Sequence, residues 1–71
     1  MSEMTPEQKR RILSEAVFIV IDEDWYRMDF CSVDDFYYTD EDSGEQYSQT
    51  YEEINLYEVE LYKLQKIQIG S

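Results

Sequence analysis

Carboxylates are the only side chains in this sequence that are both reactive and numerous. Between Asp22 and Glu60 the chain has fourteen of them and a single cation, Arg27. A pair of carboxylates can act as the general acid and base of a glycosidase, but that reaction needs a cleft that raises the pKa of one carboxyl group. A chain of 71 residues has little room for such a cleft, and it contains no histidine, the most common general base. The composition therefore predicts a protein that is not an enzyme.

The remaining motifs that could carry chemistry are weak. The single cysteine, Cys31, lies in an alternating segment, where a small buried residue is more common than a nucleophile. Glycine occurs only at positions 44 and 70, so a G-x-G-x-x-G or P-loop phosphate site cannot form. A D-x-D-x-G run begins at position 40, but Glu45 and Tyr51 stand where a calcium loop needs Gly and Glu. We therefore expect no catalytic residue, no dedicated metal site and no cofactor.

The negative charge is concentrated in the middle of the chain. The net charge is −11 overall, but residues 22–60 alone carry −13, and the first 21 residues sum to zero. A surface of this sign repels nucleic acid and anionic lipid, which argues against direct nucleic-acid binding and against a membrane role. The longest apolar run, Ala16–Ile21, is far shorter than the roughly 20 residues that span a bilayer. A single cysteine excludes an intramolecular disulfide and suits a reducing cytoplasm.

The sequence predicts one short helix near its N-terminal end. Thr5 is a good N-cap, Pro6 suits the first helical position, and Gln8 completes a T-x-x-Q capping box. The helix should run from Pro6 to Glu15. Because so short a helix is marginal alone, we expect it to pack on other elements.

After the helix the pattern becomes that of β-strands. Residues 16–21 are apolar and mainly β-branched, which predicts a buried strand. Residues 25–33 alternate, with Tyr26, Met28 and Phe30 on one face. The acidic pair that follows should interrupt the sheet.

Two further strands flank the clearest turn of the chain. Residues 40–45 combine acidic and polar residues with a glycine, and they join a strand at 36–39 to its partner at 46–51. Residues 55–69 fit either a strand or a helical stripe, and their aromatic and β-branched residues favour the strand. The residues that would share one face of that strand are Tyr57, Val59, Leu61, Ile67 and Ile69. We therefore predict a single acidic α+β domain, residues 1–71, with one short N-terminal helix packed on a twisted antiparallel sheet of four to five strands.

Carboxylates arrayed on a sheet can imitate the charge of a nucleic acid. Residues i and i+2 on one face of a strand lie about 6.6–6.8 Å apart. We expect this spacing for Glu58 and Glu60, and for Asp22 and Asp24 if the first strand continues. DNA presents one negative charge per roughly 1.7 Å of its axis, a density that such a sheet can approach. Arginines that bind phosphates can also form bidentate pairs with carboxylates.

The alternative is that the acids only keep the protein in solution. A solubilising surface usually mixes charges of both signs. This chain has one cation among fourteen anions over residues 22–60, and that asymmetry favours a binding role.

In its size, its acidic block from Asp22 to Glu60 and its β-rich pattern, the chain resembles the phage-encoded DNA-mimic inhibitors. Proteins of this type are small, acidic and poor in cysteine, and they occupy DNA-binding surfaces of host proteins. Their targets include the nucleoid protein HU, uracil-DNA glycosylase, restriction enzymes and RNA-guided nucleases. The resemblance implies a stoichiometric inhibitor in the cytoplasm of the host cell that competes with DNA for a basic protein. Compact, two-fold symmetric HU suits a chain of this size, and a homodimer of this protein would match its symmetry.

The candidate partner-binding residues are the carboxylates expected in turns and at strand ends. They are Asp22, Glu23, Asp24, Asp29, Asp34, Asp35, Asp40, Glu41, Asp42, Glu45, Glu52 and Glu53. The alternative hypothesis is a small acidic adaptor or dimerisation module without DNA mimicry, which would use an apolar C-terminal strand. Its contact residues would be Leu61, Leu64, Ile67 and Ile69.

Overall fold

The computed structural model describes residues 4–69, and its helix is the one that the capping box predicts. Helix α1 spans Pro6–Glu15. The Thr5 hydroxyl accepts a hydrogen bond from the Gln8 backbone N–H (3.2 Å), and the Gln8 side-chain oxygen accepts one from the Thr5 N–H (2.9 Å). These bonds pair donors that the start of a helix otherwise leaves without partners. The predicted beginning and end of the helix are therefore confirmed.

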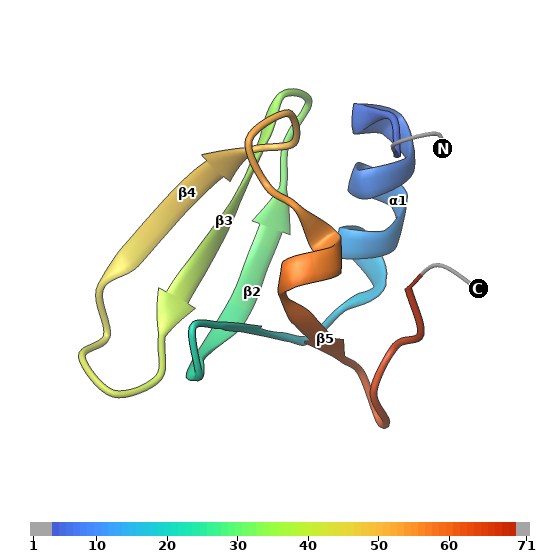
Figure 1. Ribbon diagram of the computed structural model, residues 1–71. Coiled ribbons are helices and arrows are strands. Elements are labelled where there is room, and N and C mark those ends of the chain that lie inside the picture. Colours follow the sequence, from blue (N-terminus) through green and yellow to red (C-terminus); the bar gives the residue numbers. More distant parts are fainter. Residues whose placement is uncertain (1–3, 70–71) are drawn as a thin grey trace.

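Five antiparallel strands form one sheet in the order β4-β3-β2-β1-β5 (Figure 1). Their bounds are β1 Phe18–Ile21, β2 Asp24–Cys31, β3 Asp35–Asp40, β4 Gln46–Thr50 and β5 Glu60–Tyr62. Turns join each of the first four strands to the next, so that β1, β2, β3 and β4 lie side by side. Strand β5 pairs with the other side of β1. The predicted fold class, one helix packed on an antiparallel sheet, is confirmed.

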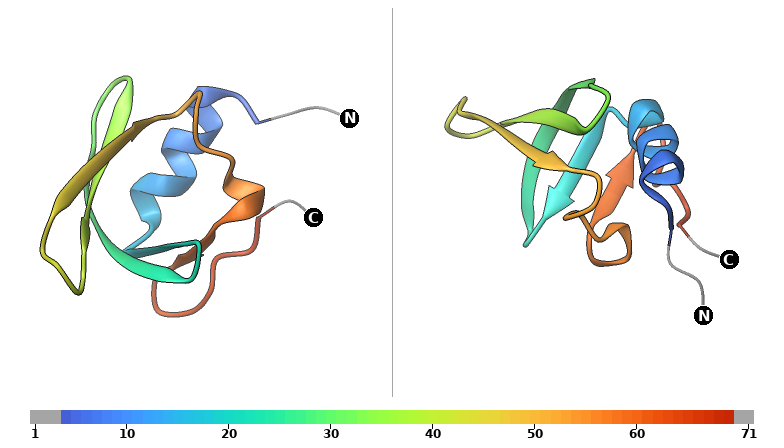
Figure 2. Two further views of the ribbon diagram at one scale, coloured as in Figure 1. Left: turned by 60° about the vertical axis from the view of Figure 1, so that its left-hand side comes forward. Right: turned by 90° about the horizontal axis from the view of Figure 1, so that it is seen from above.

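The core lies between the sheet and a layer made of α1 and the segment after β4 (Figure 2). The largest fully buried side chains are Leu13, Ile19, Phe36, Leu56 and Leu61. Within residues 4–69, nine hydrophobic residues are buried. A core of this size gives a net stability of only about 3–5 kcal/mol.

A β-bulge interrupts the alternation of β2. Met28 lies opposite Tyr38 and Phe30 lies opposite Tyr37, so Asp29 is an extra residue without a partner in β3. An extra residue reverses the side-chain alternation beyond it.

The bulge moves Phe30 to the face of the sheet that is opposite to the helix. Tyr26, Met28 and Cys31 pack against the core. Phe30 is 55 % exposed and stacks on Tyr37 at a centroid distance of 4.5 Å. The prediction that Tyr26, Met28 and Phe30 share one face is therefore wrong for Phe30.

The C-terminal segment is neither one strand nor one helix. A 3₁₀ turn, η1 (Leu56–Glu58), precedes the three-residue strand β5. The chain then turns back, and Tyr62 forms a bridge to Lys66. The prediction of a single strand over residues 55–69 is wrong, and Glu58 and Glu60 do not share a strand.

The apolar residues of this segment serve the protein's own core. Leu61 is fully buried, and Ile67 and Ile69 pack against the core. Of the four contact residues in the dimerisation hypothesis, Leu64 alone is strongly exposed, at 96 %. Most of the apolar side chains that this hypothesis assigns to a dimer interface are thus packed in the protein's own core.

Two phenylalanines give a matched test of the bulge. Phe36 is fully buried and stacks on Tyr38 and Tyr51, so Phe36→Ala should lower the free energy of unfolding by about 3–5 kcal/mol. A loss of that size is comparable to the whole stability of the fold, so the baseline of Phe36→Ala should already show unfolded molecules without urea. Phe30→Ala should lower it by only about 1 kcal/mol, because the ring is exposed and loses one stacking partner. Urea unfolding followed by Trp25 fluorescence measures both, and a larger loss for Phe30→Ala would contradict the bulge.

Candidate functional site

Seven of the twelve candidate carboxylates gather at one end of the sheet, where two turns lie side by side (Figure 1). Tyr26 lies opposite Asp40, and the Glu41 backbone N–H donates to the Trp25 carbonyl oxygen at 3.2 Å. This pairing brings the β1–β2 turn next to the β3–β4 turn. We call the group the turn-end cluster, and its members are Asp22, Glu23, Asp24, Asp40, Glu41, Asp42 and Glu45.

Four further candidates lie at the opposite end of the sheet. They come from the β2–β3 turn and from the segment after β4, which are joined where the Tyr51 N–H donates to the Asp34 carbonyl oxygen at 3.3 Å. We call them the far-end cluster, and its members are Asp34, Asp35, Glu52 and Glu53. Strands of six to eight residues separate the two clusters by roughly 20 Å. The sheet therefore sorts the acids into two groups.

Asp29, the twelfth candidate, lies between the clusters on the outer face of the sheet. Its carboxylate accepts hydrogen bonds from the Thr39 hydroxyl (2.5 Å) and the Gln46 side-chain amide (3.0 Å). These bonds lower the pKa of the Asp29 carboxyl, and the Thr39 bond is the larger cause. Asp29 is thus an oriented anion that belongs to neither cluster.

No carboxylate of either cluster forms an ion pair with another residue in the range 4–69. The one salt bridge found there joins Lys66 to Glu60 at 3.9 Å. Lys9 instead donates from its Nζ to the carbonyl oxygens of Tyr51 and Ile54, both at 2.8 Å. This cation ties α1 to the segment after β4, and the charge of the clusters stays available to an outside partner.

The β1–β2 turn places two acidic residues in a left-handed backbone conformation that asparagine and glycine adopt more easily. Asp22 and Glu23 have φ values of 51° and 70°, and they form a two-residue hairpin turn between Ile21 and Asp24. Asn-Gly is preferred in such a turn, because left-handed backbone costs about 1–2 kcal/mol for a residue with a Cβ. The first strand therefore ends at Ile21, as predicted for residues 16–21. The spacing of Asp22 and Asp24 on one strand face, expected only if that strand continued, does not occur.

The β3–β4 turn is ordered by its own hydrogen bonds. The Asp40 Oδ1 accepts from the backbone N–H groups of Asp42 (2.7 Å) and Ser43 (3.2 Å). The Gly44 N–H donates to the Asp40 carbonyl oxygen at 2.9 Å, with a φ of 78° that glycine adopts without strain. Asp40 thus builds the turn. The side chains of Glu41 and Asp42 have no hydrogen bond to another residue of the described chain.

Two tyrosines orient glutamates near the same end of the sheet. The Tyr47 hydroxyl donates to Glu45 at 2.8 Å, and the Tyr62 hydroxyl donates to Glu60 at 2.7 Å. The bond to Glu45 raises the pKa of Tyr47 to about 12, and the bond to Glu60 raises the pKa of Tyr62. Both hydroxyls therefore remain donors at neutral pH.

Aromatic groups on the outer face of the sheet were not identified from the sequence. Trp25 stacks on Tyr62 (centroid distance 4.9 Å) and meets the edge of Phe18 (6.0 Å). Phe30 stacks on Tyr37, and Trp25 is 47 % exposed. Trp25 and Tyr62 come from strands that are distant in sequence, and the other contacts depend on strand register and on the bulge, so no local pattern reveals these groups. Trp25 places an exposed aromatic ring beside the turn-end cluster.

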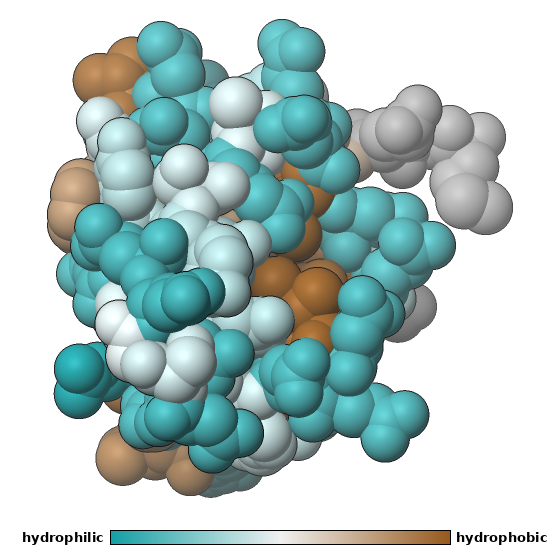
Figure 3. Space-filling model, turned by 90° about the vertical axis from the view of Figure 1, so that its left-hand side faces the viewer, coloured by the Kyte–Doolittle hydropathy of each residue, from teal (hydrophilic) through white to brown (hydrophobic). Residues whose placement is uncertain are grey.

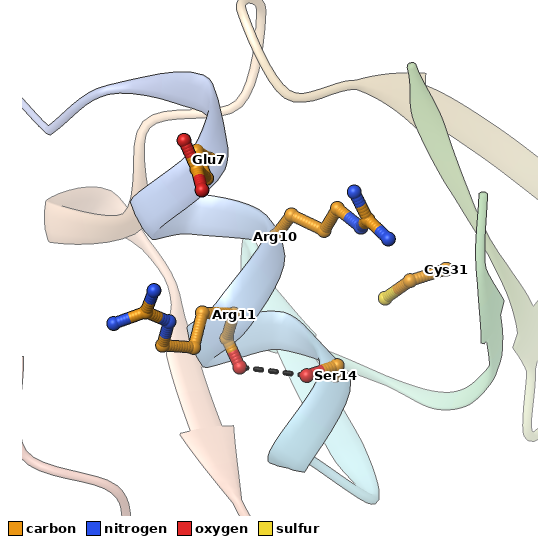
Figure 4. Close-up of a pocket in the computed structure, with 5 residues that line it drawn as sticks. All are labelled: Glu7, Arg10, Arg11, Ser14 and Cys31. Carbon is orange, nitrogen blue, oxygen red and sulfur yellow. Dashed lines mark hydrogen bonds between the residues drawn. The ribbon is translucent and has the colours of Figure 1, made fainter. Parts of the chain in front are cut away.

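A hollow of about 390 Å³ lies between α1 and β2 (Figure 4). Its lining residues are Glu7, Arg10, Arg11, Ser14 and Cys31. Figure 4 shows Arg10 extending toward Cys31, while Arg11 points to the other side of the helix. Burial raises the pKa of the Cys31 thiol, which keeps the sulfur in its less reactive form. The described side chains of this hollow therefore include no activated nucleophile.

No protein-family model, curated protein or solved structure matches this chain. Within residues 4–69, no helix combines the length and the apolar character needed to cross a membrane. In the same part of the chain, no group of three or more carboxylate or thiol side chains is placed to hold a metal ion.

Replacement of Glu23 by glycine should stabilise the protein. Glu23→Gly removes the cost of a positive φ at a residue with a Cβ, so the free energy of unfolding should rise by about 1 kcal/mol. Glu41→Gly is the matched control, because it removes the same charge from the same cluster at a residue without a positive φ. Thermal and urea unfolding measure both variants. An equal rise in the free energy of unfolding of both variants would show that the gain comes from reduced charge repulsion and not from the backbone conformation at residue 23.

The hydrogen bond from Thr39 should be visible in the titration of Asp29. Thr39→Val removes the donor that chiefly lowers the pKa of the Asp29 carboxyl, so that pKa should rise. Thr50→Val is the matched control, because Thr50 bonds a different carboxylate, Glu53, at 3.0 Å. Carbon-13 NMR titration of the side-chain carboxyls measures the change. An unaltered Asp29 pKa in Thr39→Val would contradict the assigned cause.

Proposed function

We propose that this protein is a DNA-mimic inhibitor, which binds the basic DNA-binding surface of a host protein and excludes DNA by competition. The turn-end cluster carries the proposal: seven carboxylates from two adjacent turns, none of them in an ion pair within residues 4–69. Inhibition of this kind is stoichiometric and needs no catalytic residue.

The density of charge in the turn-end cluster is similar to that of DNA. Four neighbouring strands at about 4.8 Å spacing span about 15 Å. Seven carboxylates over this width average about one charge per 2 Å, compared with one per roughly 1.7 Å of DNA axis. A basic groove that pairs with phosphates can therefore pair with these carboxylates at a comparable spacing.

The β1–β2 turn supports a binding role for the charge. An Asn-Gly pair would suit the positive φ values of Asp22 and Glu23 better, and it would also remove two anions from a repulsive cluster. Local features that lower stability are typical of functional sites. The presence of two acids at these positions is understandable if a partner contacts them.

Trp25 gives the surface an apolar contact beside the anions. Asp24 precedes Trp25 in β2, and the Trp25 carbonyl oxygen is bonded to the Glu41 N–H. Tryptophan is among the residues that contribute most to protein interfaces. Long-range charge would speed association with many basic proteins, whereas Trp25 would help to select among them.

The partner that we propose is a basic DNA-binding protein in the cytoplasm of the host cell. The nucleoid protein HU is the first target to test, because it is small, basic and two-fold symmetric. A homodimer of this chain would present the turn-end cluster twice to such a target.

Charge reversal in the turn-end cluster tests the proposal. Glu41→Lys with Asp42→Lys should weaken binding to HU at least tenfold, because two attractive contacts become repulsive. Asp40 is left intact, because its carboxylate builds the turn. The matched control is Glu7→Lys with Glu15→Lys, which changes the net charge equally on the exposed face of α1 and should change affinity less than threefold.

Displacement of a fluorescent DNA duplex from HU measures these affinities, and circular dichroism confirms that the variants are folded. Binding of the wild-type protein should weaken steeply between about 50 and 300 mM NaCl, since screening shortens the range of the charges. Equal effects of the two double variants would show that only net charge matters. Failure of the wild-type protein to displace DNA from HU would remove HU as the target.

A further inference from the structure

The two edges of the sheet differ in whether the chain closes them. At one edge, the segment after β5 folds back, the Ile67 N–H donates to the Leu61 carbonyl oxygen at 2.7 Å, and Tyr62 pairs with Lys66. At the other edge, β4 pairs with β3 alone, and no strand within residues 4–69 pairs with its second side. The chain bonds to that side only at its end, where the Ile54 N–H donates to the Thr50 carbonyl oxygen at 3.2 Å. The open edge is visible at the left of Figure 1.

The hydrogen-bond pattern identifies which backbone groups of β4 are available. The Asp40 N–H donates to the Glu45 carbonyl oxygen (2.8 Å), and the Tyr51 N–H donates to that of Asp34 (3.3 Å). In an antiparallel pair the bonded residues alternate along each strand. Tyr47 and Gln49 therefore bond to β3, and the N–H groups that point away from β3 are those of Gln46, Ser48 and Thr50.

The sequence of β4 lacks the features that usually protect an edge strand. Natural edges carry a lysine, a proline, an inward-pointing charge or a bulge. The strand reads Gln-Tyr-Ser-Gln-Thr, without charge or proline, and it pairs with β3 in regular register. Its first three residues are exposed. Figure 3 shows that this side of the molecule is mainly hydrophilic, with small separate apolar patches. A partner that binds here would use backbone hydrogen bonds more than apolar contact.

We propose that β4 accepts an extended segment of the basic partner as a sixth strand of the sheet. The inference rests on the proposed function and adds the manner of binding. The partner's segment would form main-chain hydrogen bonds to Gln46, Ser48 and Thr50 of β4, and it would carry cations at both of its ends. Strand β4 of five residues is about 17 Å long. The added segment therefore has about five uncharged residues between its lysines or arginines.

Charge selects a basic strand over a second copy of this chain. The turn-end cluster adjoins one end of β4 through Glu45, and the far-end cluster adjoins the other end through Glu52 and Glu53. If two copies paired through β4, acidic ends would meet acidic ends in both the parallel and the antiparallel arrangement. A segment with cations at both ends would meet complementary charge at each end.

A proline at the centre of β4 tests the inference. Ser48→Pro removes an N–H that points away from β3, so the pairing with β3 stays intact. It should weaken binding to HU at least tenfold. Ser48→Ala keeps the N–H, removes only the hydroxyl, and should bind like the wild-type protein. Circular dichroism and thermal unfolding report whether Ser48→Pro is folded.

A synthetic peptide tests the same contact on the unmodified protein. The probe is Lys-Lys-Thr-Val-Thr-Val-Thr-Lys-Lys, and the control is the same peptide with N-methyl groups on its five central residues. At low salt the probe should bind at least tenfold more tightly, and it should slow hydrogen exchange at the amides of Gln46, Ser48 and Thr50. The amides of Tyr47 and Gln49 are the internal reference, since β3 protects them with or without the peptide.

Equal affinity of the two peptides, or no binding of either at millimolar concentration, would overturn the inference. Unchanged binding of HU to a folded Ser48→Pro variant would also overturn it. In that case the proposed function stands if charge reversal at Glu41 and Asp42 still weakens binding. If the wild-type protein does not bind HU at all, the peptide pair still decides whether β4 accepts a basic strand.

Discussion

The pairing of β2 with β3 is the constraint on which the rest of the structure depends. The register that sets Tyr26 opposite Asp40 also brings the β1–β2 turn beside the β3–β4 turn, and the acids of both turns meet there. A slip of one residue would turn Phe36 and Tyr38 out of the core, where both are now buried. The free energy gained by burying these two rings therefore fixes the register of β2 and β3, and with it the positions of the charges.

The turn-end cluster is held together against its own repulsion. Like charges at this density lower the stability of the folded state. The core that opposes them has only nine buried hydrophobic residues in the described part of the chain. Directed hydrogen bonds keep the anions in place: the Asp42 and Ser43 N–H groups donate to the Asp40 carboxylate, and the Tyr47 hydroxyl donates to Glu45. A basic partner would relieve the repulsion as it binds, so the same charges that weaken the isolated protein would strengthen a complex.

Much of the fold could be predicted from local patterns, because those parts depend on neighbouring residues. Thr5 and Gln8 identified the start of α1, and the acidic turn that contains Gly44 separated β3 from β4. The bulge at Asp29 was not predictable, since it depends on how β2 pairs with β3 and on the side-chain hydrogen bond from Thr39 to Asp29. The acidic block was evident from the sequence. Its division into two clusters follows from strand register, which composition does not determine.

The most direct measurement of the central claim is an NMR titration of the nitrogen-15-labelled protein with unlabelled HU, followed by addition of duplex DNA. The account predicts that the largest shift changes fall in residues 22–25 and 40–48, and that excess duplex reverses them. Changes confined to α1 or to residues 61–69, or changes that duplex DNA fails to reverse, would contradict the claim that a carboxylate cluster at the end of the sheet occupies a DNA-binding surface.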